Sequence, residues 1–267
     1  SAGVAAAADW VPASSRARTL SWALLGQPAA WVVGQPLVGV VASVDWRYAF
    51  VAVPFAGTVL AMIATWTRPR DPPVATAQPR VLGLLKEPLL AGWAGGELLA
   101  YAAWSGTLLY SGTLFVDSYG MSVERVGVLL GVGAAAYFPG NFLFRRWVDA
   151  SSRQLLAFLG LALAAGVAIL GLIRSGPGLS LAVFAAVVFL AGGRTIAGSA
   201  LGLDLAPDAK VATTSVRTTA LQFGYLLGAG LGGAALALGG LGAVGVMLSV
   251  LFALGALPHL WVLVRSR

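Results

Sequence analysis

The stretch Ala191-Gly192-Gly193-Arg194-Thr195-Ile196-Ala197-Gly198-Ser199-Ala200 places one fixed positive charge inside a long apolar segment. A charge at the centre of a membrane-spanning helix costs roughly 2.5 to 3.5 kcal/mol, so such a residue usually faces a bundle interior or a watery cavity and contacts a partner. We therefore expect Arg194 to lie inside a bundle of helices, next to a group that offsets its charge.

The composition of the whole chain predicts a membrane protein. Of its 267 residues, 58% are hydrophobic and 10% are charged. Apolar runs repeatedly exceed the roughly 18 to 20 residues that cross a bilayer, and they are too long and uniform for barrel strands. We expect about eight spanning helices, near residues 19–41, 48–66, 89–115, 123–144, 154–173, 179–203, 211–238 and 241–264. The predicted fold class is an all-α, polytopic membrane bundle.

The sequence argues against metal-binding, dinucleotide-binding and nucleic-acid-binding functions. The chain has no cysteine and a single histidine, His259, so the usual ligands of a zinc or haem site are lacking. The run Gly228-Ala229-Gly230-Leu231-Gly232-Gly233 matches a dinucleotide fingerprint only in letters, because it lies inside an apolar run rather than between a strand and a helix. The net charge of +7 comes from scattered residues and forms no nucleic-acid patch. We expect no enzyme, cofactor or metal site, and we interpret His259 as an interfacial residue.

The interval 67–88 is rich in proline and basic residues and is interpreted as a cytoplasmic linker. It divides a remnant of an N-terminal half, residues 1–66 with a stub and two helices, from a six-helix C-terminal half, residues 89–267. Most of the 17 Lys and Arg residues, Arg217 among them, then fall on the linker side, as the positive-inside rule requires, and the C-terminus is expected to be cytoplasmic. Because residues 1–8 resemble the exit of a helix, we expect an N-terminal truncation.

A short repeat supports two related halves. Asp9-Trp10-Val11-Pro12 is followed by the glycines of residues 34–39, and Asp204-Leu205-Ala206-Pro207 is followed at a similar distance by those of residues 228–233. Parallel repeats of this kind occur in transporter folds. The repeat therefore favours a duplicated membrane protein whose first copy is partly missing.

Two motifs resemble those of a known family. Gln35-Pro36-Leu37-Val38-Gly39-Val40 resembles the Gly-Pro-x-x-Gly-Gly antiporter motif, with Gln35 and Val40 in place of glycines. Gly140-Asn141-Phe142-Leu143-Phe144-Arg145-Arg146 resembles a basic loop between the eighth and ninth helices, with Phe144 in place of an aspartate. On these residues the chain is similar to the major facilitator superfamily, most like its bacterial drug:proton antiporter branch. The resemblance implies twelve helices, about eight of them present here. It assigns conformational roles to Gln35, Pro36, Gly39, Gly140, Arg145 and Arg146.

Glu97 and Arg194 are expected at the same depth. Each lies about ten residues into its span from the linker side, or roughly 15 Å at 1.5 Å per residue. Glu97 is therefore predicted to be a proton or cation site, or Arg194 an anchor for an anionic substrate. A structural ion pair that holds two helices together is the alternative.

Further polar and aromatic residues extend this site. Tyr101 and Trp104 follow Glu97 at i+4 and i+7 and favour an amphipathic or aromatic substrate, with aromatic packing as the alternative. Two polar pairs inside apolar runs are candidates either for substrate contact or for hydrogen bonds between helices. These pairs are Tyr137 with Asn141 and Gln222 with Tyr225.

The predicted function is secondary active transport by alternating access. We expect proton-coupled efflux of a small amphipathic molecule, with the proton gradient as energy source and no cofactor. Uptake of a sugar or organic anion and a non-transporting membrane fragment are the alternatives. The expected surroundings are the plasma (inner) membrane and its lipids, no nucleic acid, and a monomeric full-length protein.

Overall fold

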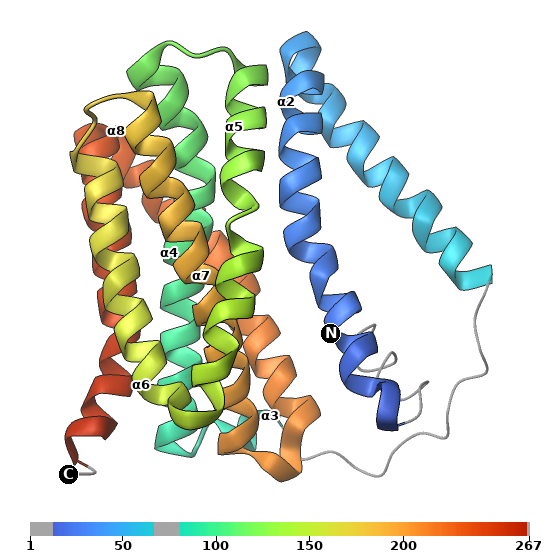
Figure 1. The fold of residues 1–267 in the computed structure, drawn as a ribbon, viewed down its shortest axis with the longest axis vertical. Coiled ribbons are helices and arrows are strands. Elements are labelled where there is room, and N and C mark those ends of the chain that lie inside the picture. The colour runs from blue at the N-terminus through green and yellow to red at the C-terminus, as the bar shows by residue number, and fades with distance from the viewer. Residues whose placement is uncertain (1–12, 67–80, 266–267) are drawn as a thin grey trace. The chain divides into compact units, whose positions relative to one another are not determined.

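The computed structural model describes the backbone of residues 13–66 and 81–265, and the side chains within 30–51, 55–63, 83–148 and 151–260. These residues form helices and connecting turns, and no strand occurs among them, so the predicted all-α membrane bundle is confirmed. The elements, shown in Figure 1, are α2 (Ala13–Trp66), α3 (Val81–Leu84), α4 (Pro88–Tyr119), α5 (Val123–Ala134), α6 (Tyr137–Leu172), α7 (Pro177–Leu205), the 3-10 turn η1 (Pro207–Ala209) and α8 (Lys210–Arg265).

Three of the long helices contain a break in the backbone. Asp45 in α2 and Ser151 in α6 have non-helical angles, and α8 is interrupted at Gly239 and Gly240. Gly240 has a φ of 66°, a left-handed conformation that glycine adopts without steric cost. Each break lies in an interval between two predicted spans, so the apolar periodicity located these turns.

The number of spans differs from the prediction. Within the described residues, four stretches are long and apolar enough to cross a membrane, or five if the bent pair Ala30–Val51 and Phe55–Ile63 counts as one span. One of the four, Pro207–Leu260, has 54 residues and includes the break in α8, so it has the length of two crossings. The predicted span at 89–115 is not among them, because α4 mixes its leucines with glycines, aromatic residues and Glu97.

Contacts between residues divide the chain into two compact units. One unit contains α2 and the segment Met121–Val132, which includes most of α5. The other consists of Gln78–Gly120 and Gly133–Arg267. Of the predicted linker, residues 67–80 lie outside the described residues, as does the first repeat copy at residues 9–12, and the linker's end contains α3. The division into 1–66, 67–88 and 89–267 stays a prediction.

The larger unit is a bundle in which α4 packs along α8, and α6 packs against both α7 and α8 (Figure 1). Small residues bring α4 and α8 close together. A Cβ atom added to Gly224 would lie 2.7 Å from the carbonyl oxygen of Leu98, and one added to Gly228 would overlap Ala102. The glycine run of α8 is therefore a surface for helix contact, as predicted, and not a dinucleotide fingerprint.

The stretch 140–146, which resembles a basic loop, is helical throughout, so the helix continues past the predicted end of the span at residue 144. Gly140 lies inside α6 against the backbone of α7, where a Cβ atom would overlap the carbonyl of Phe189. Arg145 and Arg146 are exposed on the same helix, and the Arg146 guanidinium lies 5.3 Å from the Trp147 ring centroid. The turn comes later, at Ser151, and Gly140 and Phe144 of this helix pack against α7.

We expect Gly140→Ala to lower the thermal stability of the protein in detergent. The added methyl group forces α6 and α7 apart, and overpacking of this kind typically costs about 1 to 3 kcal/mol. Gly230→Ala is the matched control, because a Cβ atom there meets nothing within 4 Å. If the Gly140→Ala and Gly230→Ala variants melt at the same temperature, the close approach of α6 to α7 at Gly140 is contradicted.

Candidate functional site

Glu97 lies at the centre of the larger unit. Its side chain is fully buried on α4. Gly198 of α7 leaves the space that the carboxylate occupies, since a Cβ atom there would lie 2.6 Å from Oε1. The packing of α4 on α7 therefore forms a recess shaped for this carboxylate.

The same contact between helices continues one turn to either side. Trp93 lies over Gly202 and donates from Nε1 to the carbonyl oxygen of Gly198 at 3.0 Å. On the other side of Glu97, the Arg194 guanidinium lies 5.8 Å from the centroid of the Tyr101 ring. In these contacts the residue numbers rise along α4 while they fall along α7, so the two helices are antiparallel here. Steps of four residues on each helix keep the contacts in register.

Arg194 pairs with Glu97, as equal depth in the membrane permitted. Arg194 Nη2 lies 2.8 Å from Glu97 Oε1, and both side chains are buried. The contact is an ion pair, since Glu97 Oε1 accepts no hydrogen bond from the described residues, and Nη2 donates to the carbonyl oxygen of Gly96 at 3.3 Å. The arginine that decided the fold thus has its expected counter-charge.

A second arginine completes the site, and sequence reasoning missed it. Arg217 Nε donates to Glu97 Oε2 at 2.8 Å. Its Nη2 donates to the Tyr101 hydroxyl at 2.6 Å and to the carbonyl oxygen of Thr195 at 3.2 Å. The topology argument counted Arg217 among the cytoplasmic charges. The available signal was its position several residues inside the predicted span 211–238, where an arginine also needs a partner.

Three tyrosines surround the charged groups. The centroid of the Tyr101 ring lies 5.4 Å from the Arg217 guanidinium and 6.2 Å from the Tyr225 ring. Tyr137 of α6 is buried and lies close enough to Tyr101, Arg217 and Tyr225 to interact with them electrostatically. Of the predicted site residues, Tyr101, Tyr137 and Tyr225 therefore come together around Glu97 and Arg194.

The other predicted site residues have different surroundings. Trp104 is buried on α4, Asn141 is half-buried on α6 with its backbone against Gly192, and Gln222 is exposed on α8. Within the described part of the chain, no hydrogen bond or ion pair joins the side chain of Asn141 or Gln222 to the charged groups. The i+3 and i+4 spacings correctly predict which residues share one face of a helix. Gln222, however, lies on a different face of α8 from the one that contacts Glu97.

The predicted conformational residues of α2 lie in the smaller unit, against α5. A Cβ atom on Gly39 would lie 3.1 Å from the Cα atom of Gly127, and one on Gly131 would lie 2.9 Å from the Pro36 ring. The carbonyl oxygen of Gln35 also faces Gly127. The stretch that resembles an antiporter motif is thus a tightly packed helix surface, and its role in a conformational change stays a prediction.

Apolar helices of spanning length around a buried cluster of ionisable residues define a polytopic membrane protein with a polar site inside its bundle. The family model of the Major Facilitator Superfamily matches residues 1–193. The chain belongs to this superfamily of transporters and is not an enzyme. The match includes Glu97 and ends one residue before Arg194, so the two arginines lie beyond it.

A curated relative is the "Probable sugar efflux transporter" of Helicobacter pylori (strain ATCC 700392 / 26695). The two sequences are 26% identical over 255 residues, which cover 94% of this chain and 64% of the relative. The chain therefore spans less than two thirds of the length of that protein.

We expect Glu97→Gln to destabilise the protein strongly, because it leaves two buried guanidinium groups without their counter-charge. Breaking a buried ion pair on one side typically costs about 3 to 5 kcal/mol. In the double variant Glu97→Gln/Arg217→Gln the site has its original net charge again, so we expect part of the lost stability to be recovered. Melting temperatures in detergent measure both effects, with the exposed Glu87→Gln as matched control. Additive losses in the double variant contradict a coupled site.

Proposed function

We propose that the protein exports a small amphipathic molecule in exchange for protons, by alternating access, with Glu97 as the proton site. The observation that carries this proposal is the position of Glu97, a fully buried carboxylate held by two arginines inside the bundle. Ionisable residues at such depth typically mark ion or substrate pathways. The proposal includes the plasma (inner) membrane as location, a cytoplasmic C-terminus and a monomeric full-length protein without a cofactor.

The two ion pairs supply a way to couple proton binding to conformation. A proton on Glu97 removes the negative charge that both guanidinium groups contact at 2.8 Å. Protonation is therefore favoured only in a conformation in which Arg217 or Arg194 has moved to another acceptor. Since these arginines are carried by α8 and α7 and the carboxylate by α4, proton exchange is linked to the relative position of three helices.

The groups around Glu97 are suited to an amphipathic substrate that carries hydroxyl groups. Tyr101, Tyr137 and Tyr225 supply aromatic faces together with hydroxyl groups, and Arg217 supplies donors. Such a surface offers hydrogen bonds to a hydroxylated ring and apolar contact to its attached group. The relative from Helicobacter pylori is described as a probable sugar efflux transporter, which supports an amphipathic sugar as the substrate class.

We expect the double variant Glu97→Gln/Arg217→Gln to lose proton-driven transport of a radiolabelled alkyl glycoside in inside-out vesicles. The double variant lacks the proton-accepting carboxylate but has the net charge of the original site. Arg217→Gln alone is the comparison variant, because it removes the same guanidinium group as the double variant but leaves the Glu97 carboxylate in place beside Arg194.

Two outcomes are informative in this experiment. If accumulation of the labelled glycoside by the double variant still responds to an imposed pH gradient, Glu97 is not the proton site. Loss of the response in the double variant, with exchange of labelled for unlabelled glycoside retained, supports it. Antibody quantification of the protein in the vesicles separates lost transport from lost expression.

Binding of an organic anion is a second candidate function, and the charge balance of the site favours it. One carboxylate faces two guanidinium groups, so the described cluster carries one uncompensated positive charge. Arg217 is the more accessible partner, with 18% of its side chain exposed compared with 7% for Arg194. A carboxylate on the substrate would therefore bind Arg217 while Arg194 holds Glu97.

If the substrate is anionic, gluconate competes with the labelled glycoside, and Arg217→Gln weakens this competition about tenfold or more, as expected for a lost charge-assisted hydrogen bond. Arg174→Gln serves as the matched control, because Arg174 is exposed in a turn between α6 and α7. Inhibition constants for gluconate measure the effect. If gluconate does not inhibit transport of the neutral glycoside, the proposal that the site binds an organic anion is contradicted.

A further inference from the structure

Arg217 uses only part of its guanidinium group inside the bundle. Nε donates to Glu97, and Nη2 donates to the Tyr101 hydroxyl and to the carbonyl oxygen of Thr195. The remaining nitrogen, Nη1, donates to none of the described residues. The buried side-chain atoms that lack a partner among these residues are Glu97 Oε1 and His259 Nε2, so Nη1 is not fully buried. With 18% of its side chain exposed, Arg217 therefore presents Nη1 to an incoming ligand.

Arg194 is held more closely than Arg217. Its side chain is 7% exposed, and its Nη2 donates to the carbonyl oxygen of Gly96. Gly96 is packed in turn against His259 of α8, where a Cβ atom on Gly96 would lie 3.1 Å from Nε2. His259, which we interpreted from the sequence as an interfacial residue, is thus buried behind the charged cluster. Arg217 is the more accessible of the two arginines for a substrate.

Tyr101 contacts both guanidinium groups. The centroid of its ring lies 5.4 Å from that of Arg217 and 5.8 Å from that of Arg194, distances at which an aromatic face attracts a cation. Its hydroxyl also accepts the 2.6 Å hydrogen bond from Arg217 Nη2. Tyr101 is buried, and a Cβ atom added to Gly224 of α8 would lie 2.9 Å from its own Cβ atom. Tyr101 is therefore a fixed group to which the arginine is bound.

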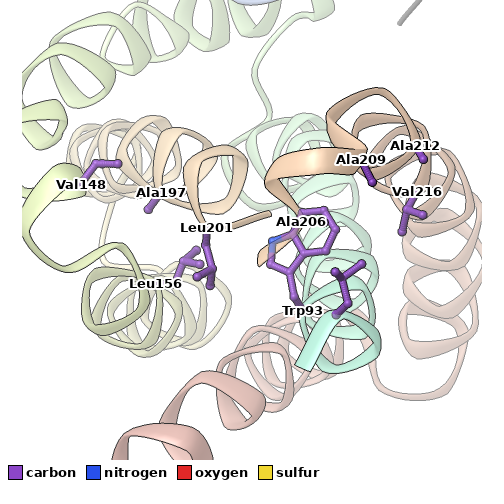
Figure 2. Packing of buried hydrophobic residues seen from close by; sticks show 10 residues of the cluster. Trp93, Val148, Leu156, Ala197, Leu201, Ala206, Ala209, Ala212 and Val216 are labelled. Carbon is purple, nitrogen blue, oxygen red and sulfur yellow. The ribbon is translucent and has the colours of Figure 1, made fainter. Parts of the chain in front are cut away.

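Packing fixes the backbone that carries Arg217, but not the guanidinium group itself. Figure 2 shows Val216 of α8 in one buried apolar cluster with Ala197 of α7 and Trp93 of α4. Arg217 follows Val216 directly, so this cluster positions the start of its side chain. The guanidinium lies at the end of a long side chain with many rotamers. Its hydrogen bonds must therefore set the direction of Nη1.

On the basis of the substrate site proposed around Glu97, we propose that Tyr101 is a positioning residue that sets substrate affinity through Arg217. Glu97 holds Nε and the Tyr101 hydroxyl holds Nη2. Because the guanidinium group is planar and rigid, these two bonds fix the direction of the third nitrogen. Nη1 then donates to a hydroxyl or ring oxygen of the transported glycoside.

The test measures exchange of labelled for unlabelled alkyl glycoside by the whole protein in vesicles, without a pH gradient. Tyr101→Phe keeps the ring and removes only the hydroxyl. We expect it to raise the glycoside concentration for half-maximal exchange about threefold or more, with little change in the maximal rate. In an Arg217→Gln background the same substitution has no further effect, because Nη1 is already absent.

Tyr110→Phe is the matched control for this experiment. Tyr110 lies further along α4, and its hydroxyl donates to the carbonyl oxygen of Ala229 of α8 at 2.7 Å. The control therefore also loses one hydrogen bond between α4 and α8, but not one that orients Arg217. We expect its half-saturating concentration to equal that of the unaltered protein.

The possible results separate this proposal from the proton role of Glu97, because exchange without a pH gradient reports substrate affinity whichever group binds the proton. Equal half-saturating concentrations in Tyr101→Phe and Tyr110→Phe overturn the proposal. An equal increase with and without the Arg217→Gln substitution also overturns it, since Tyr101 then acts independently of the arginine. A lower rate that follows a lower amount of protein, with the half-saturating concentration unchanged, shows a structural role only. If the unaltered protein exchanges no glycoside, the proposed substrate class is wrong and the inference fails with it.

Discussion

The larger unit depends on one carboxylate between two arginines. Glu97 contacts Arg194 and Arg217 at 2.8 Å each, and it thereby ties α4 to α7 and to α8. None of the three charges is tolerable alone in an apolar bundle, because each would lose its hydration without a partner. The helices must therefore pack in the arrangement that brings all three together, and the glycines at 198 and 202 make room for it.

The same contacts would connect the stability of this Major Facilitator Superfamily protein with the transport proposed for it. An ion-paired cluster that only held helices together would need no excess charge and no accessible partner. Among the described residues, one positive charge of this cluster is uncompensated and Arg217 is partly exposed. A substrate or a proton that changes the balance of these contacts changes which packing of α4, α7 and α8 is most stable, and this is the physical requirement for coupling.

Much of the site was predictable from helical spacing, and the failures have physical causes. Contact between Arg194 and Glu97 was possible because both were expected at similar depth, and Tyr101 was expected on the Glu97 face from its i+4 position. Gln222 and Asn141 were not brought to the charged groups, because spacing defines a face without saying which neighbour that face meets. Arg217 was missed because its position near a predicted helix end was interpreted as topology. The helix that was expected to end at residue 144 continues to the break at Ser151, and Gly140 within it fits closely against α7.

The sequence by itself determined the class of the protein, since long apolar runs require helices that satisfy their own hydrogen bonds in lipid. It also located the breaks near Asp45, Ser151 and Gly240, and it showed that Arg194 needs a buried partner. Only the tertiary structure decided that Glu97 is shared by two arginines and that Tyr101 accepts a hydrogen bond from one of them. Local pattern sets which residues share one helix face, whereas the pairing of faces depends on how helices distant in sequence fill space together.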